Sequence, residues 1–411
     1  MKIIGFDSWL GGFRNFKRLR NEFQDNNVDF NLIHLSSWSG TPFEEKIISN
    51  LISTDISKFN TLSFDKILKI EKPAVVVFLS TDVFAHKSMI RACRRNNIPT
   101  IHLFHGIMSV LSVNEKVSYS KSLTKKIYFA IPRILKYFKY IVPNYFISMY
   151  LDKITFKDIY IFLKTLVKLF NGHNIKKQNH DSRTDLAIVF NHFDADYAIN
   201  KFGYSLKNIK IVGSPDLYEF SLKEDELNIY QKYINKEKDY VLYLDSVPFL
   251  RGLTSPEENY NYLLKINKKV ISLGKILAIK LHPEHKKTEF SKKLSKAGVK
   301  IVDKNELISI IKNSEFVISE ATSLFQIPAL MGWPIYISIA DVFSKMSYGE
   351  VITSYPNTFK IKELREIGGS QLKIIDSSIW IKNNCGPKPF SGFNSRVFNE
   401  IKNISNESIS R

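Results

Sequence analysis

The sequence has little cysteine and no apolar run long enough to cross a bilayer. Its two cysteines, Cys93 and Cys385, exclude a disulfide framework and a metal cage built on cysteine. Basic residues such as Lys126, Arg133 and Lys136 interrupt the most apolar stretch, so the roughly 18 apolar residues of a transmembrane helix are never reached. The first residues lack the charged, apolar and small-residue succession of a signal peptide, and we therefore expect a cytoplasmic protein.

Motifs of several common enzyme classes are also missing. There is no GxGxxG, no Walker loop and no HExxH, which disfavours hydride transfer on a nicotinamide and phosphate hydrolysis by a P-loop. One acidic motif occurs, Asp194-Ala195-Asp196 beside His192, and carboxylate oxygens of this kind can hold Mg²⁺. Because such a tripeptide is common by chance, we interpret it as a solvated loop or a helix cap.

Acidic residues are scarce relative to basic ones. The chain has 59 Lys and Arg against 40 Asp and Glu, which gives a formal net charge of +19. This surplus favours polyanions, nucleotide phosphates or an anionic membrane face as partners. The hydrophobic content of 44% is typical of a chain with a real core, and 411 residues predict two domains or one large domain.

Short apolar strands alternate with amphipathic helices along most of the chain. This pattern predicts two doubly wound α/β units, which meet between residues 214 and 238 with Gly213-Ser214-Pro215 as a candidate hinge. A helix carrying Phe16, Leu19 and Phe23 on one face follows the first strand, and a helical stretch precedes the third. The predicted strands lie at 3–6, 30–35, 74–79, 100–104, 185–190 and 209–212, and then at 240–244, 275–281, 299–302, 316–319 and 334–337.

Residues 117–172 interrupt this alternation with an insert that is both basic and aromatic. Its composition is typical of a helix at a headgroup interface, where lysine meets lipid phosphate and tyrosine is half hydrated. The alternative is a helical insertion whose aromatic residues pack on their own domain. The positive charge of the chain favours the first interpretation, so we predict a peripheral protein on the anionic inner face of the cell membrane.

Polar residues follow two predicted strands of the second unit. In open α/β sheets, ligands bind outside the carboxyl ends of the strands. His282 follows one strand, and Pro283 fixes the turn that aims its ring. Ser319, Thr322 and Ser323 stand where another strand gives way to a helix, whose unpaired N–H groups attract an anion. Each segment alone is more often a plain turn or cap, but together they predict a phosphate site.

Candidate proton acceptors follow strands of the first unit. One of them is His105. The reference pKa of an unperturbed histidine is about 6.5, so a neutral imidazole at this position can accept a proton near pH 7. Gly106 allows a sharp turn beside it. Asp82 and Asp7 follow two other strands, and the Gly11-Gly12 loop lies near Asp7. The alternative for His105 is a buried histidine satisfied by backbone groups.

In order along the chain, five segments resemble GT-B type glycosyltransferases, in particular bacterial surface-polysaccharide transferases. The resemblance extends to CDP-glycerol glycerophosphotransferases and to capsular sialyltransferases and polysialyltransferases. It implies two Rossmann-like α/β/α domains that face an inter-domain cleft: an acceptor domain at 1–215, a donor domain at 216–385, and a tail at 386–411 that packs back on the first domain or frays. The segments are NIPTIHLFHG (97–106), IVGSP (211–215), IKLHP (279–283), ISEATS (318–323) and GWPI (332–335).

The resemblance also implies roles for individual residues. His282 contacts the donor phosphate, and Thr322 and Ser323 replace a Ser-Ser pair that holds the same phosphate in these families. His105 matches the acceptor base of the glycerophosphotransferases, whereas sialyltransferases often use a carboxylate, which keeps Asp82 and Asp7 as alternatives. The further donor contacts are Lys280, Pro283, Ser319, Glu320, Arg251 and Gly213, and the acceptor contacts are Gly11, Gly12 and Gly106.

We therefore expect an inverting glycosyltransferase that moves a sugar from a nucleotide-activated donor, preferably cytidine-linked as in CMP-sialic acid. The acceptor is a glycan or lipid-linked glycan of capsule, O-antigen or lipooligosaccharide. Fixed polar groups at the leaving phosphate make a metal dispensable, so we expect no cofactor, and no nucleic-acid partner. The alternatives are transfer of a polyol phosphate from CDP-glycerol or CDP-ribitol, UDP-N-acetylglucosamine 2-epimerisation, and non-catalytic binding of polyanions.

Overall fold

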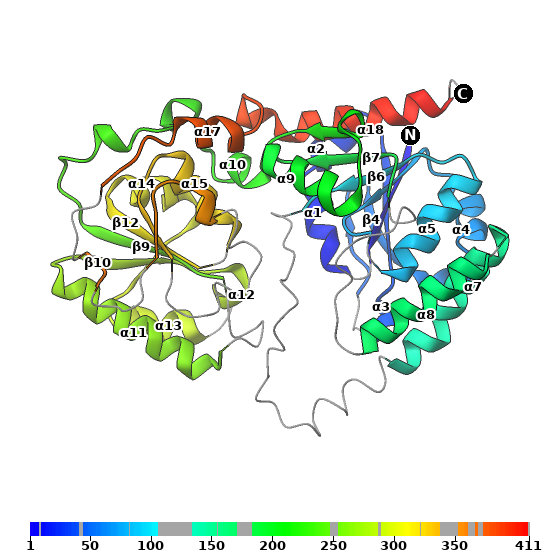
Figure 1. Cartoon of the computed structure of the whole chain (residues 1–411), viewed down its shortest axis with the longest axis horizontal. Coiled ribbons are helices and arrows are strands. Elements are labelled where there is room, and N and C mark those ends of the chain that lie inside the picture. Colours follow the sequence, from blue (N-terminus) through cyan, green and yellow to red (C-terminus); the bar gives the residue numbers. More distant parts are fainter. Residues whose placement is uncertain are drawn as a thin grey trace.

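The described strands form two separate, mainly parallel sheets, one in each half of the molecule (Figure 1). The computed structural model describes residues 1–7, 10–40, 44–81, 83–105, 134–153, 155–170, 183–246, 254–286, 289–320, 322–337, 352–360, 366–368 and 373–409.

The first sheet has eight strands in the order β3-β4-β2-β1-β5-β6-β7-β8 within these residues. Neighbouring strands are parallel except β3 and β4. The order reverses beside β1, as in a doubly wound sheet. The strands are β1 Lys2–Asp7, β2 Asp29–His34, β3 Ile47–Ile48, β4 Leu51–Asp55, β5 Val75–Phe78, β6 Thr100–Leu103, β7 Leu186–Val189 and β8 Ile209–Ile211.

The second sheet has six parallel strands in the order β11-β10-β9-β12-β13-β14 in the described part of the chain. Leu244, at the end of β9, pairs with Lys280 of β10 on one side and with Ser319 of β12 on the other. These three strands therefore end at the same level. The strands are β9 Tyr240–Leu244, β10 Ile276–Lys280, β11 Lys300–Ile301, β12 Ser314–Ser319, β13 Ile335–Ile337 and β14 Thr358–Lys360.

Each sheet is buried on both faces, because alternate residues of a strand point to opposite sides. Ile3 and Ile4, for example, are both fully buried but belong to different hydrophobic clusters. The halves are thus α/β/α layers, as predicted. The helices include α1 Phe13–Lys17, α2 Arg20–Asp25, α3 Ser36–Ser39, α4 Phe64–Glu71, α5 Phe84–Arg95, α7 Val142–Leu151, α8 Phe156–Phe170, α9 His192–Tyr197, α10 Pro215–Glu219, α11 Pro256–Ser272, α12 Pro283–Lys286, α13 Glu289–Lys296, α14 Leu307–Lys312, α15 Gln326–Leu330, α17 Ser378–Asn384 and α18 Phe393–Ile409.

The last helix, α18, belongs in space to the first half of the molecule. It lies beside α2 (Figure 1), and its apolar residues enter the core of the first sheet. The Asn394 side chain donates to the Arg18 carbonyl at 2.8 Å. The chain therefore crosses between the halves twice, once after β8 and once after α17.

The two crossing segments touch at a pair of glycines. A Cβ on Gly386 would lie only 2.7 Å from the Cα of Gly213, and both glycines have positive φ, +70° and +96°. Larger residues would have to push the segments apart. The Arg396 guanidinium then joins the crossings by donating to the carbonyls of Val212, Pro387 and Pro389.

Two parts of the first half differ from the expectation. The stretch between β2 and β5 was expected to be helical, but the hairpin of β3 and β4 lies between its two α-helices, α3 and α4. Residues of β4 alternate between buried and more exposed positions, which fits a strand with two different faces. The acidic motif at 194–196 lies in α9, where the Asn191 side chain accepts from the Asp194 N–H and caps the helix.

Candidate functional site

Three neighbouring strand ends of the second sheet carry most of the polar residues predicted to bind a donor. His282 follows β10, and Thr322 follows β12. β9 lies between these strands, and Asp245 follows it directly. Since neighbouring strands are about 4.8 Å apart, the two outer segments are separated by about 10 Å. We call this set the C-terminal edge cluster: Asp245, His282, His285, Glu320, Thr322 and Ser323.

Asp245 organises the turn that carries His282. Its carboxylate is buried and accepts the backbone N–H of His282 at 3.1 Å. The same oxygen, Oδ2, also hydrogen-bonds Nδ1 of His285. The His285 ring is fully buried and stacks on Phe290, with 4.4 Å between centroids and 9° between planes. The backbone of the turn is thus fixed, while the His282 residue itself stays partly exposed.

Glu320 lies below the same edge rather than on its surface. It is 1% exposed and accepts a hydrogen bond from the Tyr243 hydroxyl. Its backbone N–H donates to the Leu244 carbonyl at 2.9 Å. Burial and the Glu320 carboxylate together raise the pKa of Tyr243 well above its usual value. Tyr243 therefore remains a neutral hydrogen-bond donor to Glu320.

The three predicted hydroxyl residues have different partners. Ser319 Oγ donates to the Glu320 carbonyl at 2.8 Å, and Ser323 Oγ donates to Asp216 Oδ2 at 2.7 Å. Thr322 Oγ1 instead accepts the Leu324 N–H at 3.4 Å, and the described residues provide no acceptor for its own hydroxyl hydrogen. Thr322 is thus the hydroxyl of this cluster best able to donate to a ligand.

The remaining residues predicted to contact the donor are Lys280, Pro283, Gly213 and Arg251. Lys280 is 9% exposed, and its Nζ is 3.4 Å from the Val302 carbonyl and 5.6 Å from the centre of the Phe220 ring. Pro283 is exposed at the start of α12, which lies on the side of the second half that faces the first half (Figure 1). Gly213 lies at the crossing described above, and Arg251 lies outside the described residues.

The predicted acceptor side lies at the carboxyl ends of the first sheet. Asp7 ends β1 and is 3% exposed. Gly11 and Gly12 form the turn after it, and a Cβ on Gly12 would lie 2.2 Å from Asp7 Oδ2, so no other residue fits there unchanged. His105 is exposed two residues beyond β6, which is separated from β1 by β5 alone. Asp82 and Gly106 lie outside the described residues.

A second buried aspartate in the first half has a structural role that the sequence analysis missed. Asp55 is fully buried and accepts the N–H groups of Ser37 and Ser57, each at 3.0 Å. It also lies 3.3 Å from Nδ1 of the buried His34. Burial alone would raise the pKa of Asp55, but the hydrogen bonds from His34, Ser37 and Ser57 hold it well below its usual value.

This group does not have the geometry of a catalytic triad. Ser36 Oγ lies 2.9 Å from His34 Nδ1, which is the nitrogen that also faces Asp55. In a triad the serine and the carboxylate use opposite ring nitrogens. His34 is also fully buried, so the group ties the loops after β2 and β4 together.

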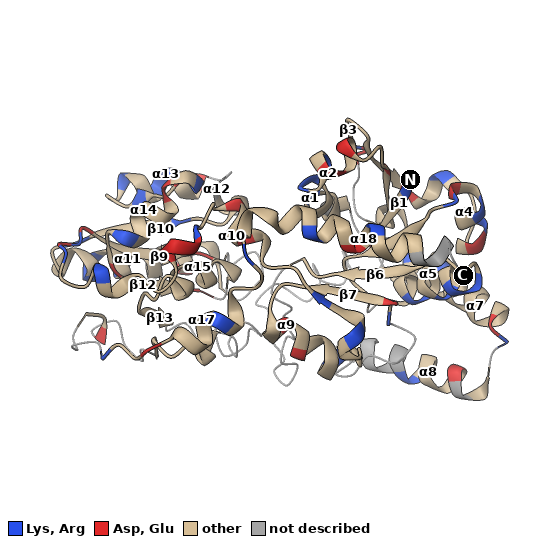
Figure 2. Cartoon of the chain, turned by 90° about the horizontal axis from the view of Figure 1, so that it is seen from above, with Lys and Arg blue, Asp and Glu red and all other residues tan. Residues whose placement is uncertain are grey.

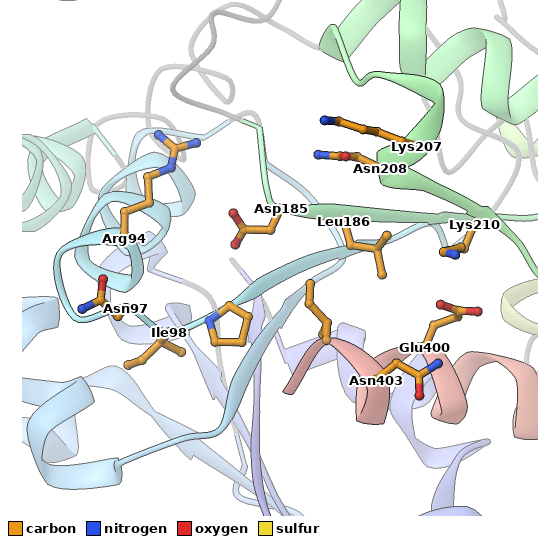
Figure 3. A pocket seen from close by; sticks show the side chains of 12 residues that line it. Arg94, Asn97, Ile98, Asp185, Leu186, Lys207, Asn208, Lys210, Glu400 and Asn403 are labelled. Carbon is orange, nitrogen blue, oxygen red and sulfur yellow. The ribbon is translucent and has the colours of Figure 1, made fainter. Parts of the chain in front are cut away.

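A cavity of about 830 Å³ lies at the opposite, amino-terminal edge of the first sheet (Figure 3). Arg94, Lys207 and Lys210 line it together with Asp185 and Glu400. The Asp185 carboxylate accepts hydrogen bonds from the N–H and the hydroxyl of Thr100, at 2.8 and 2.7 Å. The cavity is therefore separate from the strand ends that carry the predicted site.

The described residues contain neither a candidate metal cluster nor a candidate membrane span. No group of three or more His, Cys, Asp or Glu side chains there is arranged to hold a metal ion. No helix among those residues is long and apolar enough to cross a membrane.

Comparisons with known proteins show the fold. No family model and no curated protein matches the sequence. Two structures of a variant of the wall teichoic acid polymerase TagF, one of them soaked with CDPG, have TM-scores of 0.50 at 12% and 11% identity, covering 100% of this chain and 90% of theirs. The UDP-GlcNAc 2-epimerases of Methanocaldococcus jannaschii and Neisseria meningitidis have TM-scores of 0.45 and 0.46 at 12% identity, covering 98% of this chain and 99% and 100% of theirs.

The chain has the GT-B architecture. Its two Rossmann-like halves confirm the predicted fold class, while identities this low show the fold alone. The roles predicted for the two halves and for individual site residues stay predictions.

Proposed function

We propose that the protein is a metal-independent glycosyltransferase that uses a nucleotide-activated sugar and a hydroxyl of a surface glycan. The observation that carries this proposal is the shared register of β10, β9 and β12, which gathers His282, Asp245 and Thr322 at one edge. In open parallel sheets this is the edge at which ligands bind. The donor's phosphate is proposed to lie across the end of β9.

The chemistry of these groups suits a leaving phosphate. As the bond between the anomeric carbon and the phosphate oxygen breaks, negative charge grows on the phosphate. An N–H of the His282 ring and the hydroxyl of Thr322 donate hydrogen bonds to that charge, and donors fixed in advance stabilise the transition state most. Asp245 contributes indirectly, because it fixes the backbone of His282.

The acceptor hydroxyl attacks the anomeric carbon on the face opposite the phosphate, so the product has inverted configuration. Its proton passes to a base in the first half, and the nucleotide leaves with the bonding electrons. His105 is the first choice for this base because it is exposed, whereas Asp7 is 3% exposed. Asp82 remains a candidate by sequence position.

The second candidate function is transfer of a polyol phosphate from CDP-glycerol. The resemblance to the wall teichoic acid polymerase TagF, which extends over the whole of this chain, favours it. The same edge would hold the nucleotide, but the acceptor oxygen would attack phosphorus and CMP would leave. The two reactions therefore differ in the bond that breaks.

The test is to incubate the protein with CMP-sialic acid, CDP-glycerol or UDP-GlcNAc, each with and without an oligosaccharide acceptor, and to measure nucleotide products by chromatography. We expect CMP from CMP-sialic acid only when acceptor is present. If CDP-glycerol is the one donor of the three that releases CMP or UDP, the result supports polyol-phosphate transfer. If UDP-GlcNAc is epimerised without acceptor, the result supports an epimerase. Turnover of none of the three donors contradicts the proposal.

A matched pair of variants controls for contaminating activity. His282→Ala should remove the nucleotide release. Asn208→Ala replaces another partly exposed polar residue, which lines the cavity at the amino-terminal edge of the first sheet, and should leave the release unchanged.

A further inference from the structure

Large exposed apolar side chains are concentrated in one part of the molecule. Among the described residues, nine of twenty such side chains lie between positions 134 and 163. This segment comprises the π-helical turn Tyr137–Ile141, the residues just before it, α7, and the first half of α8. The nine are Ile134, Leu135, Phe138, Phe146, Tyr150, Leu151, Phe156, Tyr160 and Leu163.

Helix α8 presents three of them as a continuous outward stripe. Phe156, Tyr160 and Leu163 are 94%, 62% and 54% exposed, and their spacing of four and three residues places them on one helix face. We call them the α8 stripe. Another face of α8 is anchored by the buried Phe162, whose ring lies 5.1 Å from that of Phe84 and 5.5 Å from that of Tyr145. The helix is thus fixed to its domain with its apolar stripe uncovered.

The charged residues of this segment divide by sign. Its acidic residues, Asp152 and Asp158, face arginines of α5: Asp152 pairs with Arg95 and lies 3.6 Å from Arg91, while Asp158 lies 4.0 Å from Arg91. Three lysines of this surface, Lys139, Lys153 and Lys164, are exposed. Among the described residues, no carboxylate lies within ion-pair distance of them, so their positive charges are not neutralised. The surface around the stripe is therefore apolar and net positive.

Some of these lysines lie over aromatic rings of the same surface. Lys164 Nζ is 5.5 Å from the centre of the Tyr160 ring, and Lys139 Nζ is 5.2 Å from that of Tyr140. Lysine beside tyrosine, at the border of an apolar stripe, is the pattern of a helix that lies in the headgroup region of a membrane.

We propose that α8, with the exposed residues of α7 and of the preceding turn, rests on an anionic lipid bilayer. The α8 stripe enters the headgroup region, and Lys139, Lys153 and Lys164 meet lipid phosphates. A second copy of the chain is a poorer occupant, because two equally positive surfaces repel each other. Both helices lie on the side of the first half that is remote from the second sheet (Figures 1 and 2), where a bilayer can reach them.

The proposal goes beyond the proposed transferase function and does not depend on it, since its test measures binding to vesicles. The whole protein is mixed with vesicles of phosphatidylglycerol and phosphatidylcholine, or of phosphatidylcholine alone, and separated by flotation. We expect binding to the anionic vesicles that weakens as salt is added. Absence of binding to the anionic vesicles at low salt overturns the proposal.

Two sets of variants locate the contact. Phe156→Ser, Tyr160→Ser and Leu163→Ser combined should lower binding at least tenfold. Lys139→Gln with Lys164→Gln should lower binding to anionic vesicles about 25-fold, at about fivefold for each lysine near the surface. Equal binding of the stripe variant and the unchanged protein contradicts the proposal.

The controls replace the same residue types on other surfaces. Ile379→Ser removes a 78% exposed apolar side chain of α17, and Lys207→Gln with Lys210→Gln removes two lysines beside the cavity of Figure 3. Both should bind vesicles like the unchanged protein, and circular dichroism should show the same fold for all. A dimer that the stripe variant dissociates, without vesicle binding by either protein, assigns the surface to a second copy and overturns the proposal.

Discussion

The two halves of the molecule use a buried aspartate in the same way but to different ends. Asp55, at the end of β4, and Asp245, just after β9, both accept backbone N–H groups and both approach a buried histidine through Nδ1. Around Asp55 the partners belong to the loops after β2 and β4, so the group stabilises these two loops. Around Asp245 one partner is the backbone of His282, which stays partly exposed. The same arrangement thus ties two loops together in one half and, in the other, fixes the backbone of His282 at the edge proposed to bind the donor.

The largest effect should come from the side chain that Asp245 positions. His282→Ala should lower kcat/KM about 100-fold or more, since loss of one donor to a developing charge has this magnitude. Nucleotide affinity, measured by calorimetry, should fall as well.

His105→Ala should lower kcat while nucleotide still binds normally. Normal rates for both His282→Ala and His105→Ala would show that the site is elsewhere.

Asp245→Asn should produce a smaller loss of turnover, on the order of tenfold, because asparagine keeps the shape but weakens the hydrogen bonds that position the turn. The loss should include a rise in the donor KM, since His282 is then held less well. Asp185→Asn is the matched control: Asp185 also accepts a backbone N–H, but at the other edge of the first sheet. A similar kinetic loss in both variants would contradict a specific role of Asp245.

Asp55→Asn should affect stability rather than kinetics. We expect a loss of about 2 kcal/mol in the free energy of unfolding at pH 7, as for hydrogen bonds to a charged group. Because the folded pKa of Asp55 is lowered, its contribution is complete above the unfolded pKa of about 3.9 and is lost as the pH falls below it. The gap between variant and unchanged protein, measured by urea unfolding, should therefore narrow in acid. A constant gap would be inconsistent with this explanation.

Ser323→Ala and Thr322→Ala should separate support from ligand contact. Burial raises the pKa of Asp216, and the Ser323 hydroxyl opposes that shift, so Ser323→Ala should lower the unfolding free energy by about 1–2 kcal/mol. Thr322→Ala loses only a weak helix cap, roughly 0.5–1 kcal/mol, yet should lower turnover more. The reverse order of kinetic effects would assign the ligand contact to Ser323.

The smallest effect should come from removing metal ions. We expect transferase activity to persist in a chelator such as EDTA, because fixed donors at the edge of the second sheet take the place of a metal. The acidic motif at 194–196 belongs to α9 of the first half and not to the residues of that edge. Loss of activity that Mg²⁺ restores would contradict this expectation.

The sequence was sufficient for most strands but not for the details of the site. β9 has its predicted bounds, and Phe16, Leu19 and Phe23 lie in one core as their spacing predicted. The sequence pattern did not predict the β3–β4 hairpin, because these strands are short and β4 carries polar residues, Ser53 and Asp55, on its buried face.

Within the site, the rule that ligands bind at strand ends predicts His282, and the same rule is the signal that could have found Asp245, which follows β9 directly. The role of His285 could not be predicted, because it depends on stacking with Phe290 and on a carboxylate 40 positions away. Such contacts arise only when the strands come together in register.

The helix α18 has a consequence for the order in which the protein is completed. Its residues Phe393, Val397, Phe398 and Ile401 fill the core of the first sheet, yet they are synthesised only after the entire second half. A nascent chain that has just finished β8 therefore exposes apolar surface on its first half. That half completes its core only when α18 has been synthesised and packs against this surface.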